Sequence, residues 1–131
     1  MFGKATTKQE NYPSNRIDSL VGNGTVIEGD LIFTGGLRIE GEIRGDVSVA
    51  STDAGMLVLG SDALINGNVR VTHLVVGGTV NGSVYVTDTV ELLPTAKVRG
   101  DIHYGTLEMK VGAVIQGHLV HMGDESSMPS R

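Results

Sequence analysis

The chain has 131 residues, about one domain's worth, with 19 glycines, no tryptophan and only five phenylalanines and tyrosines. Valine, isoleucine and threonine are abundant, and this composition favours many short strands over a helix bundle. The net charge of −5 argues against a nucleic-acid-binding protein, and the lack of cysteine excludes disulfides, thiolate metal sites and a thiol nucleophile. Since no apolar run has the length of a membrane span or the form of a secretion signal, we expect a soluble, cytoplasmic, all-β protein.

The first 18 residues are polar and show no strand-like alternation, which predicts a disordered N-terminal arm over 1–18. Within this arm, Lys4 and Lys8 are the only charged side chains before Glu10. Residues 123–131 are also polar and predict a short disordered C-terminal tail. Almost all of the apolar content lies between these segments, so we interpret 19–122 as one folded domain.

A glycine flanked by aliphatic residues recurs along this domain. The pattern aliphatic-x-Gly-x-aliphatic occurs, for example, as Ile65-Asn-Gly-Asn-Val69 and Val98-Arg-Gly-Asp-Ile102. The glycines that mark the repeat are Gly29, Gly45, Gly67, Gly82, Gly100 and Gly117. Their spacings of 16, 22, 15, 18 and 17 residues indicate about six repeated units.

Between these glycines, apolar and polar residues alternate in runs such as Val47-Ser-Val49, which is typical of short strands with one buried face. About three such strands fit in each repeat, and stacking equivalent strands builds a continuous interior. A β-meander is the alternative, because Asn66-Gly67 and Asn81-Gly82 are hairpin signals. Other repeats have residues such as Arg99 before the glycine, which a tight hairpin turn disfavours. The sequence therefore predicts a parallel β-helix of about six coils, with glycine where the chain turns a corner.

The two ends of a β-helix expose unpaired backbone groups above an apolar interior. Neither terminal segment is apolar enough to cover them, so we predict that molecules stack end to end into a filament. The residues expected at this polymerisation interface are Leu20, Val26, Leu31 and Phe33 in the first coil and Leu107, Met109, Val111, Ile115, Leu119 and Val120 in the last. The alternative is a monomeric adaptor that closes its own ends and binds other proteins with its flat faces.

Motifs for catalysis and for cofactor binding are absent from the sequence. It contains no phosphate-binding loop, no His-Glu-x-x-His and no nucleophile elbow, so we expect no catalytic residues and no cofactor. We also expect no metal site, because His118 and His121 are three residues apart and would lie on opposite faces of a strand. A hexapeptide-repeat acyltransferase, a left-handed β-helix with a period near 18, is the enzyme alternative. It is disfavoured because each repeat here has one glycine corner and not three equivalent hexads.

The most specific stretch of the chain lies near its C-terminal end. The sequence Val90-Glu-Leu-Leu-Pro-Thr-Ala-Lys-Val-Arg-Gly-Asp-Ile-His-Tyr104, followed by Leu107-Glu-Met109 and Gly112-Ala-Val-Ile-Gln-Gly117, resembles the bactofilins, a family of polymer-forming bacterial cytoskeletal proteins. The resemblance covers about 18–122. It implies a right-handed parallel β-helix that polymerises without a nucleotide. It also implies a cytoplasmic scaffold at the inner membrane, which serves cell shape or polar structures and recruits cell-wall enzymes.

The N-terminal arm gains a meaning from this resemblance. Some bactofilins begin with a membrane-targeting peptide of Met-Phe-x-Lys character, and Met1, Phe2 and Lys4 match it residue by residue. Met1 and Phe2 can insert at the headgroup boundary, while Lys4 and Lys8 attract anionic lipid by about 1 kcal/mol each. One copy would bind weakly, but a filament presents many copies. The expected partners are therefore other copies of the chain, inner-membrane lipid, and cell-wall or polar proteins that the sequence does not identify.

Overall fold

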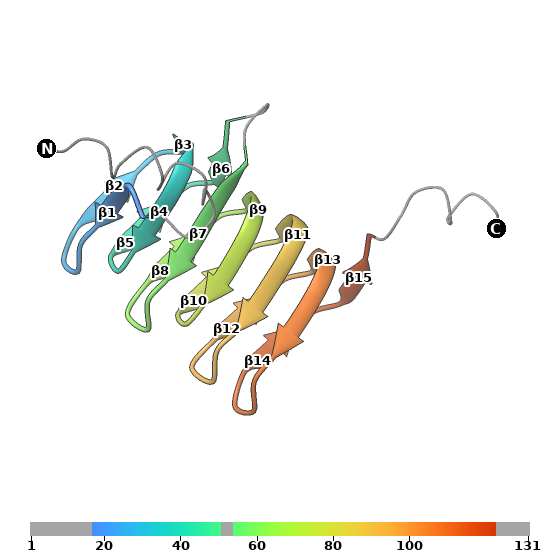
Figure 1. Cartoon of the computed structure of the whole chain (residues 1–131). Helices are drawn as coiled ribbons and strands as arrows, with labels where there is room; N and C mark the ends of the chain where they lie inside the picture. Colours follow the sequence, from blue (N-terminus) through green and yellow to red (C-terminus); the bar gives the residue numbers. More distant parts are fainter. Residues whose placement is uncertain (1–16, 51–53, 123–131) are drawn as a thin grey trace, which may run out of the picture.

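A computed structural model describes residues 17–50 and 54–122 of the chain. These residues form fifteen strands and no helix, and every pairing between the strands is parallel. The strands stack side by side along one axis as a parallel β-helix (Figure 1). This confirms the predicted all-β fold and excludes the β-meander, because neighbouring strands of a meander run antiparallel.

Each coil contributes one strand segment to each of three faces. The first face contains β1 (Ser19–Val21), β4 (Gly35–Ile39), β7 (Gly55–Leu59) and the C-terminal parts of β9 (Val69–Val76), β11 (Val84–Leu92) and β13 (Ile102–Met109). The second face contains β2 (Val26–Glu28), β5 (Glu42–Arg44), β8 (Leu64–Asn66), β10 (Thr79–Asn81), β12 (Lys97–Arg99) and β14 (Val114–Gln116). The third face contains β3 (Leu31–Phe33), β6 (Val47–Val49), the N-terminal parts of β9, β11 and β13, and β15 (Leu119–His121).

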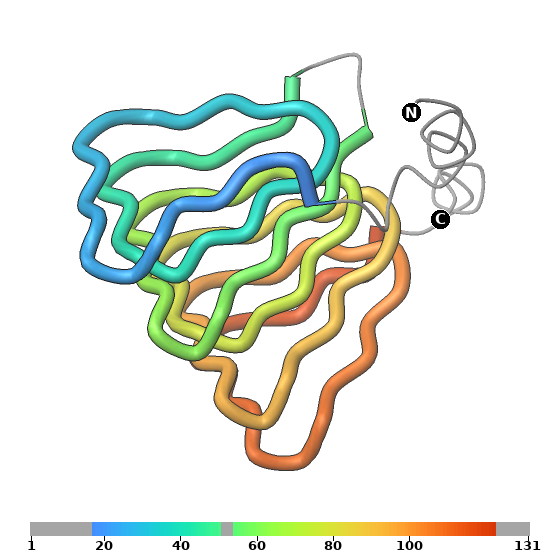
Figure 2. The backbone as a smooth tube through the Cα atoms, turned by 60° about the vertical axis from the view of Figure 1, so that its left-hand side comes forward, coloured from blue at the N-terminus to red at the C-terminus, as the bar shows by residue number. Residues whose placement is uncertain are grey.

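These segments make six coils of three segments each, as predicted. The coils span residues 19–33, 35–49, 55–71, 73–86, 89–104 and 106–121. Figure 2 shows them as loops stacked from the blue N-terminal end to the red C-terminal end. At about 4.8 Å for each added strand, the stack is about 29 Å long.

Three strands are longer than the short strands predicted from the sequence. β9, β11 and β13 have 8, 9 and 8 residues, because each continues from the third face onto the first. A single residue spans this corner in β9 and β13, Thr72 and Gly105 respectively. β11 uses Thr87 and Asp88, and its register with both neighbours shifts there. A link this short leaves the backbone extended, so the corner does not interrupt the strand.

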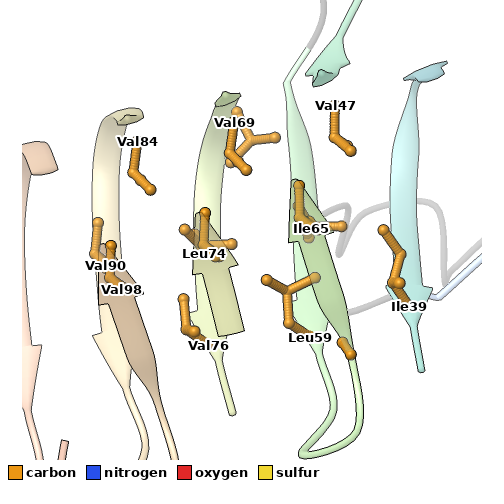
Figure 3. Close-up of a cluster of buried hydrophobic side chains, with 14 of the residues drawn as sticks. Ile39, Val47, Leu59, Ile65, Val69, Leu74, Val76, Val84, Val90 and Val98 are labelled. Carbon is orange, nitrogen blue, oxygen red and sulfur yellow. The ribbon is translucent and has the colours of Figure 1, made fainter. Parts of the chain in front are cut away.

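The interior is filled by aliphatic side chains that form rows along the axis (Figure 3). On the second face, Ile43, Ile65 and Val80 are paired neighbours, and each has a relative exposure of 0%. No polar or charged side chain is buried among the described residues. Since the alternating pattern sends every second side chain inward, the short strands of each coil share one dry core.

The six repeat glycines lie at the corner between the second and third faces. A Cβ added to Gly67 would be 2.1 Å from the carbonyl oxygen of Gly45, and one added to Gly82 would be 2.1 Å from that of Gly67. The coils therefore approach so closely at this corner that no side chain fits. In several coils the next residue adds a second ladder, in which, for example, Asn68 Oδ1 accepts a hydrogen bond from the backbone N–H of Ser83 at 3.0 Å.

Candidate functional site

The N-terminal end of the β-helix is lined by inward side chains that have a neighbour on one side only. Ile27 heads the inward row of the second face, and Leu31 and Phe33 head the two inward rows of the third. All three are partly exposed, whereas Ile43 and Val47, directly beneath Ile27 and Leu31, are fully buried. The second and third faces of the first coil thus present aliphatic and aromatic surface along the axis, whereas Val21, at the end of the first face, is buried.

The C-terminal end repeats this arrangement with the last coil. Leu107 and Met109 end the inward rows of the first face, Ile115 ends that of the second and Leu119 ends one of the third. Met109 and Leu119 are 47% and 46% exposed, while their neighbours in the coil above, Leu92 and Ile102, are fully buried. Open apolar surface is therefore present on both terminal coils. These two coils lie at opposite ends of the stack (Figure 1).

Four residues predicted at the polymerisation interface point elsewhere. Leu20, Val26 and Val120 occupy outward positions of their strands, beside Arg38, Glu42 and His103 respectively. Val111 lies in the turn between β13 and β14 and is 96% exposed. Apolar character alone did not separate inward from outward positions in these segments; the strand register does. The other predicted interface residues occupy inward positions at the open ends: Leu31, Phe33, Leu107, Met109, Ile115 and Leu119.

Both ends also carry strand edges that are free within the described residues. β1, β2 and β3 pair only with β4, β5 and β6, and β14 and β15 pair only with β12 and β13. In the middle of the stack, each segment has a partner on both sides. Each end therefore combines unpaired backbone donors and acceptors with apolar side chains, which is the chemistry needed to add a further coil.

The predicted membrane-binding residues Met1, Phe2, Lys4 and Lys8 lie outside the described residues, as does the tail 123–131. The boundary of the N-terminal arm differs slightly from the prediction. Asp18, placed in the arm, donates its backbone N–H to the carbonyl oxygen of Gly36 at 2.8 Å and accepts the N–H of Gly36 at 3.0 Å. In the described part of the chain, no helix is long and apolar enough to cross a membrane.

A shallow hollow of about 250 Å³ lies between the turns of the first and third coils. Its lining includes three carboxylates, of Glu40, Glu42 and Asp62, and the side chain of Asn23, whose Nδ2 lies 3.3 Å from Asp62 Oδ2. Across residues 17–50 and 54–122, no group of three or more histidine or acidic side chains has the arrangement of a metal site. The hollow thus offers an acidic surface without an assembled set of metal ligands.

A column of stacked side chains on the outward side of the third face was missed by sequence reasoning. The guanidinium of Arg70 lies 4.7 Å from the ring centre of Tyr85, and the rings of Tyr85 and His103 are stacked at 4.4 Å. The three residues are 15 and 18 positions apart, so the glycine period could have aligned them. Because the guanidinium and the two rings stack on one another, these side chains mainly contact each other and so join successive coils.

Another contact between coils lies at the C-terminal corner. The backbone N–H of His118 donates to Asp101 Oδ1 at 3.0 Å, and His118 Nδ1 lies 3.1 Å from the same oxygen. The backbone hydrogen bond, followed by the imidazole hydrogen bond, lowers the pKa of Asp101 below its ordinary value of 3.8. His118 is therefore engaged by the coil above, not by His121.

Comparison with known proteins places this architecture in a family. The bactofilin family model, described as polymer-forming cytoskeletal, matches residues 19–120. The chain belongs to the bactofilin family. The bactofilin BacP of Myxococcus xanthus (strain DK1622) is 30% identical over 120 residues, which cover 92% of this chain and 48% of BacP. The bactofilin BacO of the same organism is 24% identical over 118 residues, which cover 90% of this chain and 85% of BacO. No solved structure matches the chain.

Family membership confirms the resemblance inferred from the sequence. The chain spans about half the length of BacP, and the part matched by the bactofilin model coincides with the six-coil β-helix. The family is described as polymer-forming cytoskeletal, which places the β-helix in a structural cytoskeletal class.

Proposed function

We propose that this bactofilin assembles end to end, through the open apolar ends of its β-helix, into filaments that need no nucleotide. The observation that supports this most directly is the contrast within single inward rows. On the second face, Ile43, Ile65 and Val80 are 0% exposed, whereas Ile27 and Ile115 at the two ends of the same row are half-buried. A stacked neighbour would bury them as the interior coils are buried.

The energetics favour such a junction. Fully burying a large aliphatic side chain contributes about 1.5–3 kcal/mol, so completing the burial of a half-exposed Met109 or Leu119 contributes about 1 kcal/mol each. Three strand edges meet in addition, and each backbone hydrogen bond adds about 1 kcal/mol net. Several such terms on both sides of the junction are needed to outweigh the entropy lost on association.

The decisive experiment is negative-stain electron microscopy of the purified protein, with and without added nucleotide. The wild type is expected to form filaments under both conditions. Leu119→Glu places a charge in the open end and should abolish them, whereas Val120→Glu places the same charge on the outward side of the same strand and should not. Circular dichroism checks that both variants keep their strands.

Two results would contradict the proposal. Filaments of Leu119→Glu that match those of the wild type would show that the open C-terminal end is not the junction. Uniform small particles of the wild type at all concentrations would show that the ends are closed, and would favour the monomeric adaptor.

We further propose that the N-terminal residues Met1, Phe2, Lys4 and Lys8 hold these filaments on the cytoplasmic side of the inner membrane, where the filaments would recruit cell-wall or polar proteins. A short apolar and basic peptide binds anionic bilayers weakly, and repetition along a filament multiplies the attachment. Co-sedimentation with vesicles containing phosphatidylglycerol tests this. Phe2→Glu should lose binding, and Thr6→Glu, which adds the same charge but keeps Phe2, should retain more of it. Equal pelleting of Phe2→Glu and the wild type would refute the attachment.

A further inference from the structure

The second face carries a row of outward side chains that mirrors itself about the middle of the stack. The row contains the first residue of each strand on this face, and in axial order it is Val26, Glu42, Leu64, Thr79, Lys97 and Val114. Reading inward from both ends pairs a valine with a valine, a carboxylate with an ammonium group, and a leucine with a threonine. Two copies in antiparallel orientation would therefore match at every position of the row.

The charged side chains of the second face leave a net charge of opposite sign at its two ends. Glu28 and Glu42 both bind Arg44, at 2.7 and 2.8 Å, so this cluster at the N-terminal end of the face keeps a net negative charge. At the C-terminal end, Lys97 and Arg99 are exposed, and their side chains have no hydrogen bond or ion pair within residues 17–50 and 54–122. The face is thus acidic at one end and basic at the other.

The apolar positions of the row are also exposed. Val26 is 47% and Val114 is 44% exposed, although both lie on a regular sheet face and not in a turn. Antiparallel pairing would place each valine opposite the other valine of the second copy. The two ends of the row would then bury apolar surface that is now in contact with water. In the same contact, the carboxylate of Glu42 would lie opposite the ammonium group of Lys97.

The other two faces lack this combination. On the first face, Arg38 already binds Glu40, and Leu20 at one end would meet Glu108 of the other. On the third face, Arg70 is engaged by the ring of Tyr85. Only the second face pairs exposed apolar ends with a cation that has no partner in the described part of the chain.

We infer that the second face is a lateral interface on which two antiparallel copies of the chain pack sheet to sheet. A two-fold axis parallel to the strands relates the copies and brings Glu42 of each opposite Lys97 of the other. It also brings Arg44 opposite Arg99, but the two ion pairs of Arg44 with Glu28 and Glu42 outweigh its charge. The face is three residues wide and about 29 Å long, so it covers about 300 Å² for each copy. This is well below the ~800 Å² for each partner of a stable dimer, so the contact needs the repetition that a filament provides. The inference therefore rests on the proposed end-to-end assembly.

Charge reversal combined with electron microscopy tests the interface. At low salt, wild-type filaments are expected to lie in pairs or bundles. Lys97→Glu should lower the fraction of paired filaments about tenfold, because the repulsion repeats at every subunit. Arg70→Glu, the same change of charge on the third face, should leave the pairing unchanged. The double variant Glu42→Lys/Lys97→Glu should restore it, because the two-fold axis brings the reversed charges together again.

The outcomes separate this inference from the proposed function. A complete absence of filaments in the wild type would overturn end-to-end assembly and the lateral interface with it. Single, unpaired wild-type filaments would overturn the lateral interface alone. So would equal effects of Lys97→Glu and Arg70→Glu, or a double variant that stays unpaired.

Discussion

The middle and the ends of this β-helix use the same repeat but bury it to different degrees. Ile65 in the third coil and Ile115 in the sixth occupy the same inward row, yet Ile65 is fully buried and Ile115 is only partly so. Both contribute the same side chain to the same kind of strand. The difference lies in the neighbours, since Ile65 has a coil on each side and Ile115 has one. Burial in this fold is therefore a property of stacking, and the terminal coils remain incomplete until something stacks on them.

Truncation of these two isoleucines should give the largest difference between the regions. Ile65→Ala leaves a cavity in a closed core and should lower the free energy of unfolding by about 4 kcal/mol. Ile115→Ala removes a partly exposed side chain, and its cost in the unassembled protein should be about 1 kcal/mol. Urea denaturation at a concentration below that of filament formation measures both. Equal losses would mean that the last coil is already covered.

The side chain of Ile115 should matter more for assembly than for the stability of the unassembled protein. If a neighbour completes the core at the junction, then Ile115→Ala should raise the protein concentration needed for filament formation, whereas the outward substitution Gln116→Ala should change it little. Sedimentation over a concentration series measures that threshold. A threshold unaffected by Ile115→Ala would remove this residue from the junction.

The corner glycines offer a second contrast, of intermediate size. A Cβ on Gly45 would lie 2.3 Å from the carbonyl oxygen of Gly29, whereas one on Gly22, in the turn of the first coil, meets nothing within 4 Å. Gly45→Ala should therefore destabilise the fold by about 1–3 kcal/mol, as expected for an overpacked site. Gly22→Ala should change the free energy of unfolding by less than about 0.5 kcal/mol. Thermal unfolding of the two variants tests the comparison, and a mild effect of Gly45→Ala would indicate that the coils can separate at this corner.

The smallest effect is expected at the Asp101–His118 contact of the last corner. Because the pKa of Asp101 is lowered in the folded protein, the contact contributes stability above pH 3.8, and this contribution is lost as the pH falls through the lowered pKa. The thermal midpoint of Asp101→Asn should therefore fall less than that of the wild type on acidification below pH 3.8. Parallel curves for the two proteins would show that the contact contributes nothing measurable, as is common for exposed pairs.

Much of the fold could be predicted from the sequence, because its main constraint is local and periodic. Gly45, Gly67 and Gly82 recur where the coils come too close for a Cβ, so their spacing reports the length of a coil directly. The alternation in β6 and in the N-terminal part of β11 likewise reports which face is buried. These features need no knowledge of how distant segments pair.

Other features depended on pairing and could not be read from the chain alone. Leu20 and Val21 are both apolar, and only the pairing of Leu20 with Arg38 shows that Leu20 points outward. The same holds for Val26, which pairs with Glu42. The continuation of β9 through Thr72 depends on the geometry of the corner, and this geometry could not be predicted from a link of one residue. The membrane-binding prediction for Met1, Phe2, Lys4 and Lys8 rests on sequence alone and stays a prediction.

The column of stacked glycines also makes the length of the rod adjustable. The stretch 67–81 is one full repeat, and Gly82 packs on Gly67 as Gly67 packs on Gly45. Its inward side chains are aliphatic like those before and after it, so its removal would bring equivalent surfaces together and shorten the rod by one layer. The first and last coils, and therefore both ends, would be unchanged. In a filament, the distance between equivalent binding sites on successive subunits would then change in steps of about 4.8 Å, one step for each coil added or removed.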